Sequence, residues 1–225
     1  MLIELPKYIP ALTLALGFAT LLFAYVRWEI DRRLKTQLAT VLIATHLETL
    51  SRQCFSVSID DGTWNDPEHP DHPHGRGQNH NEAMVNAPDI PKFETFKDVS
   101  MIGLRKLDRL MSLRTIQISI ESRLSATSRH DHPDYKDYFY ERRLFYGALG
   151  LISAELALKL RLSVRSKGMR DTVANEREKL RKTLDDLADK AAHPEAWKDI
   201  YPRFCLYDET LYWPKAFKPF APKTP

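Results

Sequence analysis

Residues Tyr8–Val26 read YIPALTLALGFATLLFAYV and contain no charged side chain. As a helix that rises about 1.5 Å per residue, this stretch is about 28 Å long and nearly matches a hydrocarbon core about 30 Å thick. Aromatic residues suit the headgroup zones of a bilayer; Tyr8 lies at one border, and Tyr25 and Trp28 lie at the other. Pro10 falls in the first helical turn, where its missing N–H costs little. The stretch therefore predicts a transmembrane helix.

Two other interpretations of this stretch fit less well. A cleaved signal peptide has a basic start and small residues at its cleavage site. Here the charge of Glu4 cancels that of Lys7 before the apolar run, so the start is not basic. The segment Phe23–Arg27 at the end of the run has large side chains where a cleavage site needs small ones. A helix in the core of a soluble protein that is apolar on every side needs a much larger protein around it.

The basic residues that flank the apolar stretch predict its orientation. Lys7 precedes the stretch, whereas Arg27, Arg32, Arg33 and Lys35 follow it closely. Lys and Arg are enriched on the cytoplasmic side of membrane helices. We therefore expect a single-pass protein whose C-terminal domain lies in the cytoplasm.

The composition allows one domain of ordinary size beside the anchor. The chain has 225 residues, of which 43% are hydrophobic, and a formal net charge of +3. This mild charge makes nucleic acid an unlikely partner and suits a domain held near an anionic lipid surface. Cys54 and Cys205 are far apart and form no CxxC motif, so we expect two reduced thiols.

Helical spacing continues beyond the apolar stretch without a Gly or Pro from Trp28 to about Gln53. The membrane helix is therefore predicted to run on as one long rod with an apolar stripe. That stripe must be covered by later helices, by the C-terminal tail or by another copy of the chain. Its members are Leu34, Leu38, Val41, Leu42, Ile43, Leu47, Leu50 and Cys54.

We expect an all-α fold built from three units. Residues 1–27 form the N-terminal tail and the transmembrane helix. The helix continues into a cytoplasmic antiparallel helical bundle at 28–200, which a long irregular loop rich in Pro, Gly, Asp and His interrupts at 57–92. Residues 201–225 form an extended tail, rich in Pro and aromatic residues, that packs on the bundle. The later helices are expected at about 91–127, 134–165 and 171–191.

Two of these later helices contain a segment that allows a second interpretation. The hexad TIQISI at 115–120 alternates like a strand, but its flanks have helical spacing, so we assign it to a helix. The apolar helix around Leu144–Leu160 contains Glu155, Lys159 and, just after it, Arg161. These charges argue against a second membrane span, because charge near the centre of a span is costly.

Histidines supply the candidate metal ligands. His69, His72, His74 and His80 lie in the irregular loop among acidic residues, and neutral imidazole binds zinc and related divalent metals. The spacing matches no zinc-finger or HExxH frame, and the prolines between the histidines favour an extended chain. The alternative is a polar surface loop.

The segment His130-Asp131-His132 resembles the His-Asp pair of metal-dependent phosphohydrolases. In that family the pair lies on a helix inside a metal cage, whereas Pro133 follows it here. Turn formation and helix capping by Asp131 or Asp134 are the alternative. A di-metal site from His46, Glu48 and Glu155 is a further hypothesis, against which a buried Glu155 paired with a neighbouring Arg or Lys is expected.

Two surface features are candidates for binding. An aromatic cluster from Tyr135 to Tyr146 suits either a binding platform or a core. Basic residues on two helices suit phosphate or lipid, although acidic neighbours dilute them; they are Arg105, Lys106, Arg109 and Arg114 on one, and Arg177, Lys179, Arg181 and Lys182 on the other.

The sequence contains no Gly-rich phosphate loop and no GxSxG motif. We therefore expect a membrane-tethered, non-enzymatic interaction or assembly module whose partners are the bilayer and either a protein or a second copy of the chain. The alternative is a membrane-bound metal-dependent hydrolase that uses the His-rich or His-Asp-His segment with zinc or another divalent metal.

Overall fold

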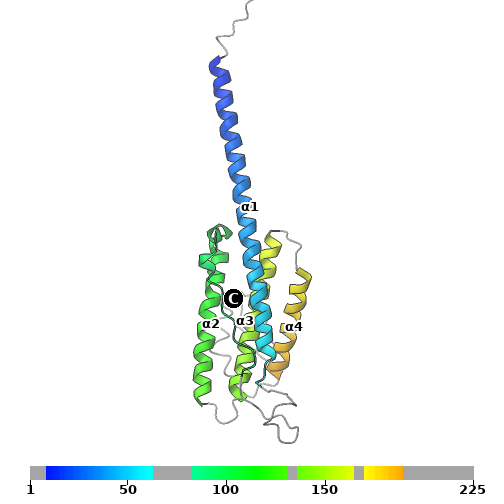
Figure 1. Ribbon diagram of the computed structural model, residues 1–225. Helices are drawn as coiled ribbons and strands as arrows, with labels where there is room; N and C mark the ends of the chain where they lie inside the picture. The colour runs from blue at the N-terminus through cyan, green and yellow to red at the C-terminus, as the bar shows by residue number, and fades with distance from the viewer. Residues whose placement is uncertain (1–8, 63–82, 131–135, 165–169, 190–225) are drawn as a thin grey trace, which may run out of the picture.

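The computed structural model describes residues 9–62, 83–130, 136–164 and 170–189 (Figure 1). Within these ranges the chain is all-helical and has no strand, which confirms the expected α class. Four helices and two short 3₁₀ turns make up the described structure. They are α1 (Ile9–Ile59), η2 (Phe93–Thr95), η3 (Val99–Ile102), α2 (Leu104–His130), α3 (Lys136–Ser163) and α4 (Arg170–Asp189).

Helix α1 is one unbroken helix, as the sequence predicted, and it has two parts with opposite surroundings. From Thr13 to Leu38 none of its side chains is buried, and Ala39 is the first that is. Beyond Ala39 it supplies core residues such as Ile43 and Leu47, each fully buried. In Figure 1 the first part projects alone from the end of the packed helices. By length and apolar composition α1 is able to cross a membrane.

The predicted apolar stripe on α1 is therefore covered only in part. Ile43, Leu47, Leu50 and Cys54 are buried. Leu34, Leu38 and Leu42 belong to the same stripe but remain 53%, 70% and 47% exposed. Within the described residues, later helices cover the stripe only from about Ala39 onward.

Helix α3 lies at the centre, in contact with the other three helices. Its C-terminal end meets the middle of α1 through Arg161 and Glu48, and its N-terminal end meets the end of α1 through Arg142 and Asp60. The two helices are therefore antiparallel. The end of α2 meets the start of α3 through Arg123 and Glu141. On α4, Arg181 meets Glu155 whereas Leu187, further along, meets Tyr140 near the start of α3, so both helices also run antiparallel to α3. Consequently α1, α2 and α4 share one direction, opposite to that of α3 (Figure 1).

Glycines let α3 approach α1 and α4 closely. A Cβ atom on Gly150 would lie 2.8 Å from Cβ of Cys54 and 3.2 Å from the Ser51 carbonyl oxygen. One turn earlier, a Cβ on Gly147 would meet the end of the flexible Leu184 side chain at 3.0 Å. The backbones of α1 and α3 are thus in near-contact at Gly150, which is why α3 cannot carry a larger side chain there.

Two boundaries differ from the sequence-based expectation. The helix expected from about 91 begins only at Leu104, because Asp98 and Gly103 adopt left-handed or positive φ values of 61° and 92°. Phe96 and Val99 accordingly lie in the turns before α2. The expected loop 57–92 begins slightly later, since α1 continues to Ile59, and residues 83–92 carry no helix or strand. The hexad at 115–120 is helical, as expected.

The predicted charged and apolar positions of α3 and α4 are confirmed. Glu155 is buried and pairs with Arg181 at 3.3 Å. The apolar stripe of α4 faces the core through Val173, Leu180, Leu184 and Leu187. Cys54 is buried, and burial raises the pKa of its thiol, so this thiol is unreactive. Cys205 and the tail 201–225 lie outside the described residues.

Gly150→Ala is expected to destabilise the protein by about 1–3 kcal/mol, because the new methyl group collides with Cys54 and forces α1 and α3 apart. Gly147→Ala is the matched control in the same helix. It should cost less, since the Leu184 side chain can move and alanine favours a helix by about 1 kcal/mol over glycine. Urea unfolding of both variants in detergent measures the difference, and equal loss in both would contradict the close contact.

Candidate functional site

A buried ion pair joins the end of α1 to the start of α3. The Arg142 Nη1 atom lies 2.9 Å from Asp60 Oδ2, and both side chains are 3% exposed. Arg142 also donates to the Val85 carbonyl oxygen. The Asp60 carboxylate accepts hydrogen bonds from the backbone N–H groups of Gly62 at 3.1 Å and Val85 at 2.9 Å. One carboxylate therefore ties the end of α1 to Val85 and to the start of α3.

This arrangement lowers the pKa of Asp60. Burial alone raises the pKa of a carboxyl group. In Asp60 the hydrogen bonds from Val85, Arg142 and Gly62, together with the Arg142 charge, outweigh burial, so that its pKa lies below the ordinary value. Gly62 is required beside it, because it has a φ of 72° and any Cβ would lie within 2.6 Å of the Phe139 ring.

Gln117 of α2 holds the same segment, residues 85–90, at a second place. The Gln117 side-chain amide donates to the Pro88 carbonyl oxygen at 3.1 Å, and its oxygen accepts from the Ile90 N–H at 3.3 Å. Pro88 and Ile90 are buried, and backbone groups shielded from water need such partners. Asp60 and Gln117 thus hold residues 85–90 against the helices, although this segment has no regular secondary structure.

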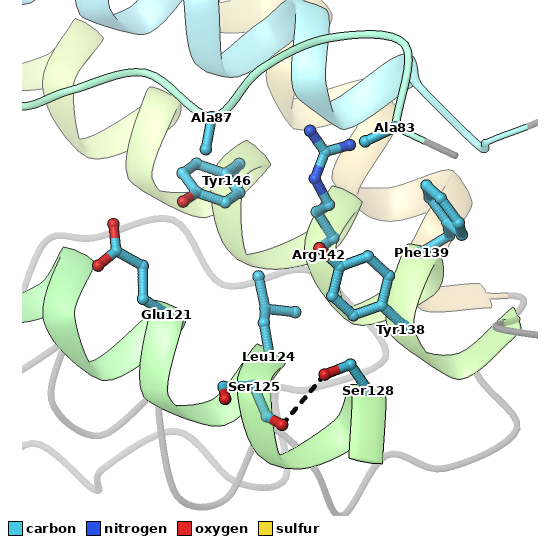
Figure 2. Close-up of a pocket in the computed structure, with 10 residues that line it drawn as sticks. All are labelled: Ala83, Ala87, Glu121, Leu124, Ser125, Ser128, Tyr138, Phe139, Arg142 and Tyr146. Carbon is cyan, nitrogen blue, oxygen red and sulfur yellow. Dashed lines mark hydrogen bonds between the residues drawn. The ribbon is translucent and has the colours of Figure 1, made fainter. Parts of the chain in front are cut away.

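A cavity of about 520 Å³ lies beside this ion pair, between α2, α3 and the segment 83–87 (Figure 2). Its walls are aromatic on the α3 side, with Tyr138 turned toward the centre in Figure 2. Its polar groups come from both α2 and α3. The lining residues are Ala83, Ala87, Glu121, Leu124, Ser125, Ser128, Tyr138, Phe139, Arg142 and Tyr146.

The chemistry of this cavity suits binding by hydrogen bonds and aromatic contact. Burial, and then the charge of Glu121, raise the pKa of Tyr146, so its phenol stays neutral and can act as a donor. Glu121 accepts a hydrogen bond from Gln117 at 2.8 Å. The guanidinium of Arg142 is occupied by Asp60 and Val85, so Arg142 serves the structure rather than an anion. Within the predicted aromatic cluster, Phe139, Phe145 and Tyr146 are buried and Tyr138 is half-buried, while Tyr135 lies outside the described residues.

The structure brings none of the proposed di-metal ligands together. Glu48 pairs with Arg161 at 2.9 Å in the core, and Glu155 pairs with Arg181. The ring of His46 packs against Phe96 with 4.8 Å between centroids. Among the described residues, no three His, Cys, Asp or Glu side chains are grouped so that they could hold a metal ion.

The histidines of the other metal hypotheses lie outside the described residues, namely His69, His72, His74, His80 and His132. His130 is the last residue of α2, and its side chain is not described. The flanks of both His-containing segments are nevertheless close, since Ala83 and Ser128 line the same cavity. Metal binding at these segments therefore stays a prediction.

The predicted anchor residues are placed as follows. Tyr8 lies outside the described residues, and Pro10 is in the first turn of α1. Tyr25 and Trp28 are 63% and 55% exposed, with their ring centroids 6.1 Å apart. The Arg32 guanidinium lies over the Trp28 ring at 5.4 Å, and Arg33 pairs with Glu29 at 2.7 Å. An aromatic pair capped by an arginine suits the border between hydrocarbon and headgroups.

Comparison with known proteins yields no relative. The sequence matches no protein-family model, no curated protein sequence and no solved structure.

Asp60→Ala is expected to cost about 3–5 kcal/mol, because it leaves the buried Arg142 charge without a partner. The pH dependence should follow from the lowered pKa. The contribution of Asp60 is complete above the ordinary Asp pKa of 3.8 and is lost as pH falls through the folded-state value. Urea unfolding at several pH values measures both effects. Asp89→Ala, at an exposed position, is the control, and an Asp60→Ala loss no larger than that of the control would contradict the proposed role.

Proposed function

We propose that this chain is a single-pass, non-enzymatic interaction module. In this proposal α1 crosses the bilayer and holds the packed helices, with the cavity and the segments that flank it, in the cytoplasm close to the membrane. The observation that carries the proposal is the division of α1. Its first part is unburied up to Leu38 and free of charge up to Val26, while its second part belongs to the core.

The unburied first part supports a bilayer as its surroundings. Large apolar side chains such as Leu14, Phe18 and Leu21 are 77%, 68% and 71% exposed. A continuous exposed apolar surface of this kind marks a membrane or partner contact. A helix also satisfies all of its own backbone hydrogen bonds, as a membrane-spanning segment must.

The basic residues after the span support the cytoplasmic orientation. Arg27, Arg32, Arg33 and Lys35 follow the span, against Lys7 before it. Arg33 pairs with Glu29, and Lys35 pairs with Asp31 at 2.6 Å. These pairs do not weaken the argument, because orientation follows the number of Lys and Arg residues rather than the net charge.

The exposed leucines between span and core support a protein contact, for which a second copy is the occupant we propose. Leu34, Leu38 and the half-buried Val41 have the four-three spacing of a coiled-coil seam. Two copies in one bilayer have parallel α1 helices, so the same leucines lie at the same height in both. Pairing then covers the part of the stripe that later helices leave exposed.

A cysteine at Leu38 is expected to form a disulfide-linked dimer when membranes that contain the full chain are oxidised. Cys205→Ser removes the second native cysteine, and the first, Cys54, is buried. Gln37→Cys is the matched control, because the adjacent residue points about 100° away around the helix. Non-reducing electrophoresis reports the dimer. Absence of a Leu38→Cys dimer, or equal dimer at both positions, would count against self-association along this stripe.

A fluorescent reporter fused after Pro225 is expected to fluoresce, and alkaline phosphatase fused there to be inactive, in bacterial cells. This result follows from a cytoplasmic C-terminal side. Replacing Arg27, Arg32, Arg33 and Lys35 by alanine should make the orientation mixed, since it removes the charge bias. Active phosphatase on the unchanged chain would show that the orientation is reversed.

A further inference from the structure

The packed helices end in an exposed tip beside residues 27–38 of α1, the stem that connects the apolar stretch to the core. The tip, residues 97–106, consists of η3, the turn at Gly103 and the start of α2. It packs on α1 through η3, and the Phe96 ring just before it contacts His46. The pKa of Lys35 is raised mainly by Asp31 and to a smaller extent by Asp98, which places Asp98 near the level of Lys35. In Figure 1 the starts of α2 and the end of α3 lie at the end from which α1 projects.

The side chains on this tip are of two kinds. Leu104 is 84% exposed, the largest fraction of any large apolar side chain described, and Met101 is 40% exposed. Leu162, at the same end of the molecule on α3, is 59% exposed. The exposed charged residues of the tip are all basic: they are Lys97, Arg105 and Lys106. The one acidic residue, Asp98, is half-buried.

The tip lies within reach of a bilayer that α1 spans. From Val26, the last uncharged residue of the apolar stretch, to Lys35 the helix rises about 14 Å. The headgroup layer is about 5–8 Å thick on each side. Membrane helices tilt by about 20° on average, so a tilt toward α2 brings the tip down to the headgroups. Apolar side chains ringed by lysine and arginine are the composition of surfaces that bind anionic membranes.

We propose that this tip is a second membrane contact, in which Leu104 and Met101 enter the headgroup layer and Lys97, Arg105 and Lys106 bind anionic lipid phosphates. The proposal rests on the proposed function, because α1 must first cross the bilayer. In this proposal the packed helices are held at the membrane in two places, by α1 and by the tip. A second copy of the chain or the residues 190–225 covering the tip would be incompatible with it.

The test is lipid quenching of a fluorescent label on the full chain in vesicles. The label is attached to Leu104→Cys, Leu14→Cys or Met84→Cys, each with Cys205→Ser. Leu14 reports the span. Met84 is exposed next to Val85, which is held at the far end of α1 by Asp60. The vesicles contain brominated phosphatidylcholine with or without phosphatidylserine.

The expected result is quenching at Leu14 in both lipids, quenching at Leu104 that increases with phosphatidylserine, and none at Met84. Quenching at Leu14 without quenching at Leu104 would overturn the second contact and leave the anchor intact. No quenching at Leu14 would overturn the anchor and, with it, this inference. A Leu104 label shielded from aqueous iodide but not quenched by lipid would show that protein covers the tip, which also overturns it.

A charge-matched pair of variants tests the basic residues. Arg105→Glu with Lys106→Glu should abolish the phosphatidylserine dependence at Leu104, because the tip then repels anionic lipid. Lys179→Glu with Lys182→Glu changes the net charge equally at exposed positions on α4 and should leave the dependence unchanged. Equal loss in both pairs would show that only the overall charge matters, contrary to the proposal.

Discussion

The close packing of α3 on the second half of α1 is the contact on which the other helices depend. At Gly150 the two backbones approach so closely that a single methyl group would overlap Cys54. Buried ion pairs at both ends of the contact, Arg161 with Glu48 and Arg142 with Asp60, align the helices along their length. Helices α2 and α4 then pack on the sides of α3. Breaking a buried ion pair by removing one partner is costly, so these pairs favour one register over its neighbours.

The same contact has a consequence for the rest of α1. Because α1 is one helix, whatever fixes its second half also fixes the direction of its first half. With α1 in a bilayer, the packed helices would have a fixed distance and angle relative to the membrane, whereas a flexible linker would leave both variable. The exposed leucines of the stem and the basic, apolar tip of α2 both lie in the zone where that constraint brings protein and lipid together. Our two proposed contacts, with a second copy and with anionic lipid, use different residues of this zone: the leucines of α1 for the first and the tip for the second.

Most helices of the fold are predicted by sequence patterns that extend over many residues and do not depend on any single one. The charge-free run, the long helix without Gly or Pro and the apolar spacing of α3 and α4 are repeated signals, and the structure confirms the helices they predict. The start of α2 could not be found in this way, because it depends on positive φ values at Asp98 and Gly103. The exposure of Leu34 and Leu38 could not be predicted from the sequence either. An apolar stripe indicates that one face of α1 is in contact with something, but it does not show how far along α1 the later helices extend.

The candidate site was harder to predict for a related reason. Asp60, Gln117 and Arg142 are isolated polar residues in the sequence, and only folding brings them to one segment. The sequence Asp60-Asp61-Gly62 does indicate a turn, but nothing local shows that an arginine 82 residues later pairs with it. The histidines, in contrast, form a conspicuous pattern in sequence, yet the described structure supplies no metal site for them. Most of these histidines lie outside the described residues, so metal binding there stays a prediction, whereas the buried ion pair was missed because its partners are far apart in the sequence.

The central claim is that one continuous helix both leaves the packed core and enters the bilayer. Pulsed electron paramagnetic resonance on the full chain in nanodiscs measures this directly, with spin labels at Leu14 and Thr49 and labelled protein diluted with unlabelled protein. Both positions are exposed, and an unbroken helix separates them by about 52 Å. We expect a single narrow distance distribution near that value. A broad distribution, or one centred at a much shorter distance, would show that α1 bends or breaks between membrane and core and would contradict the account.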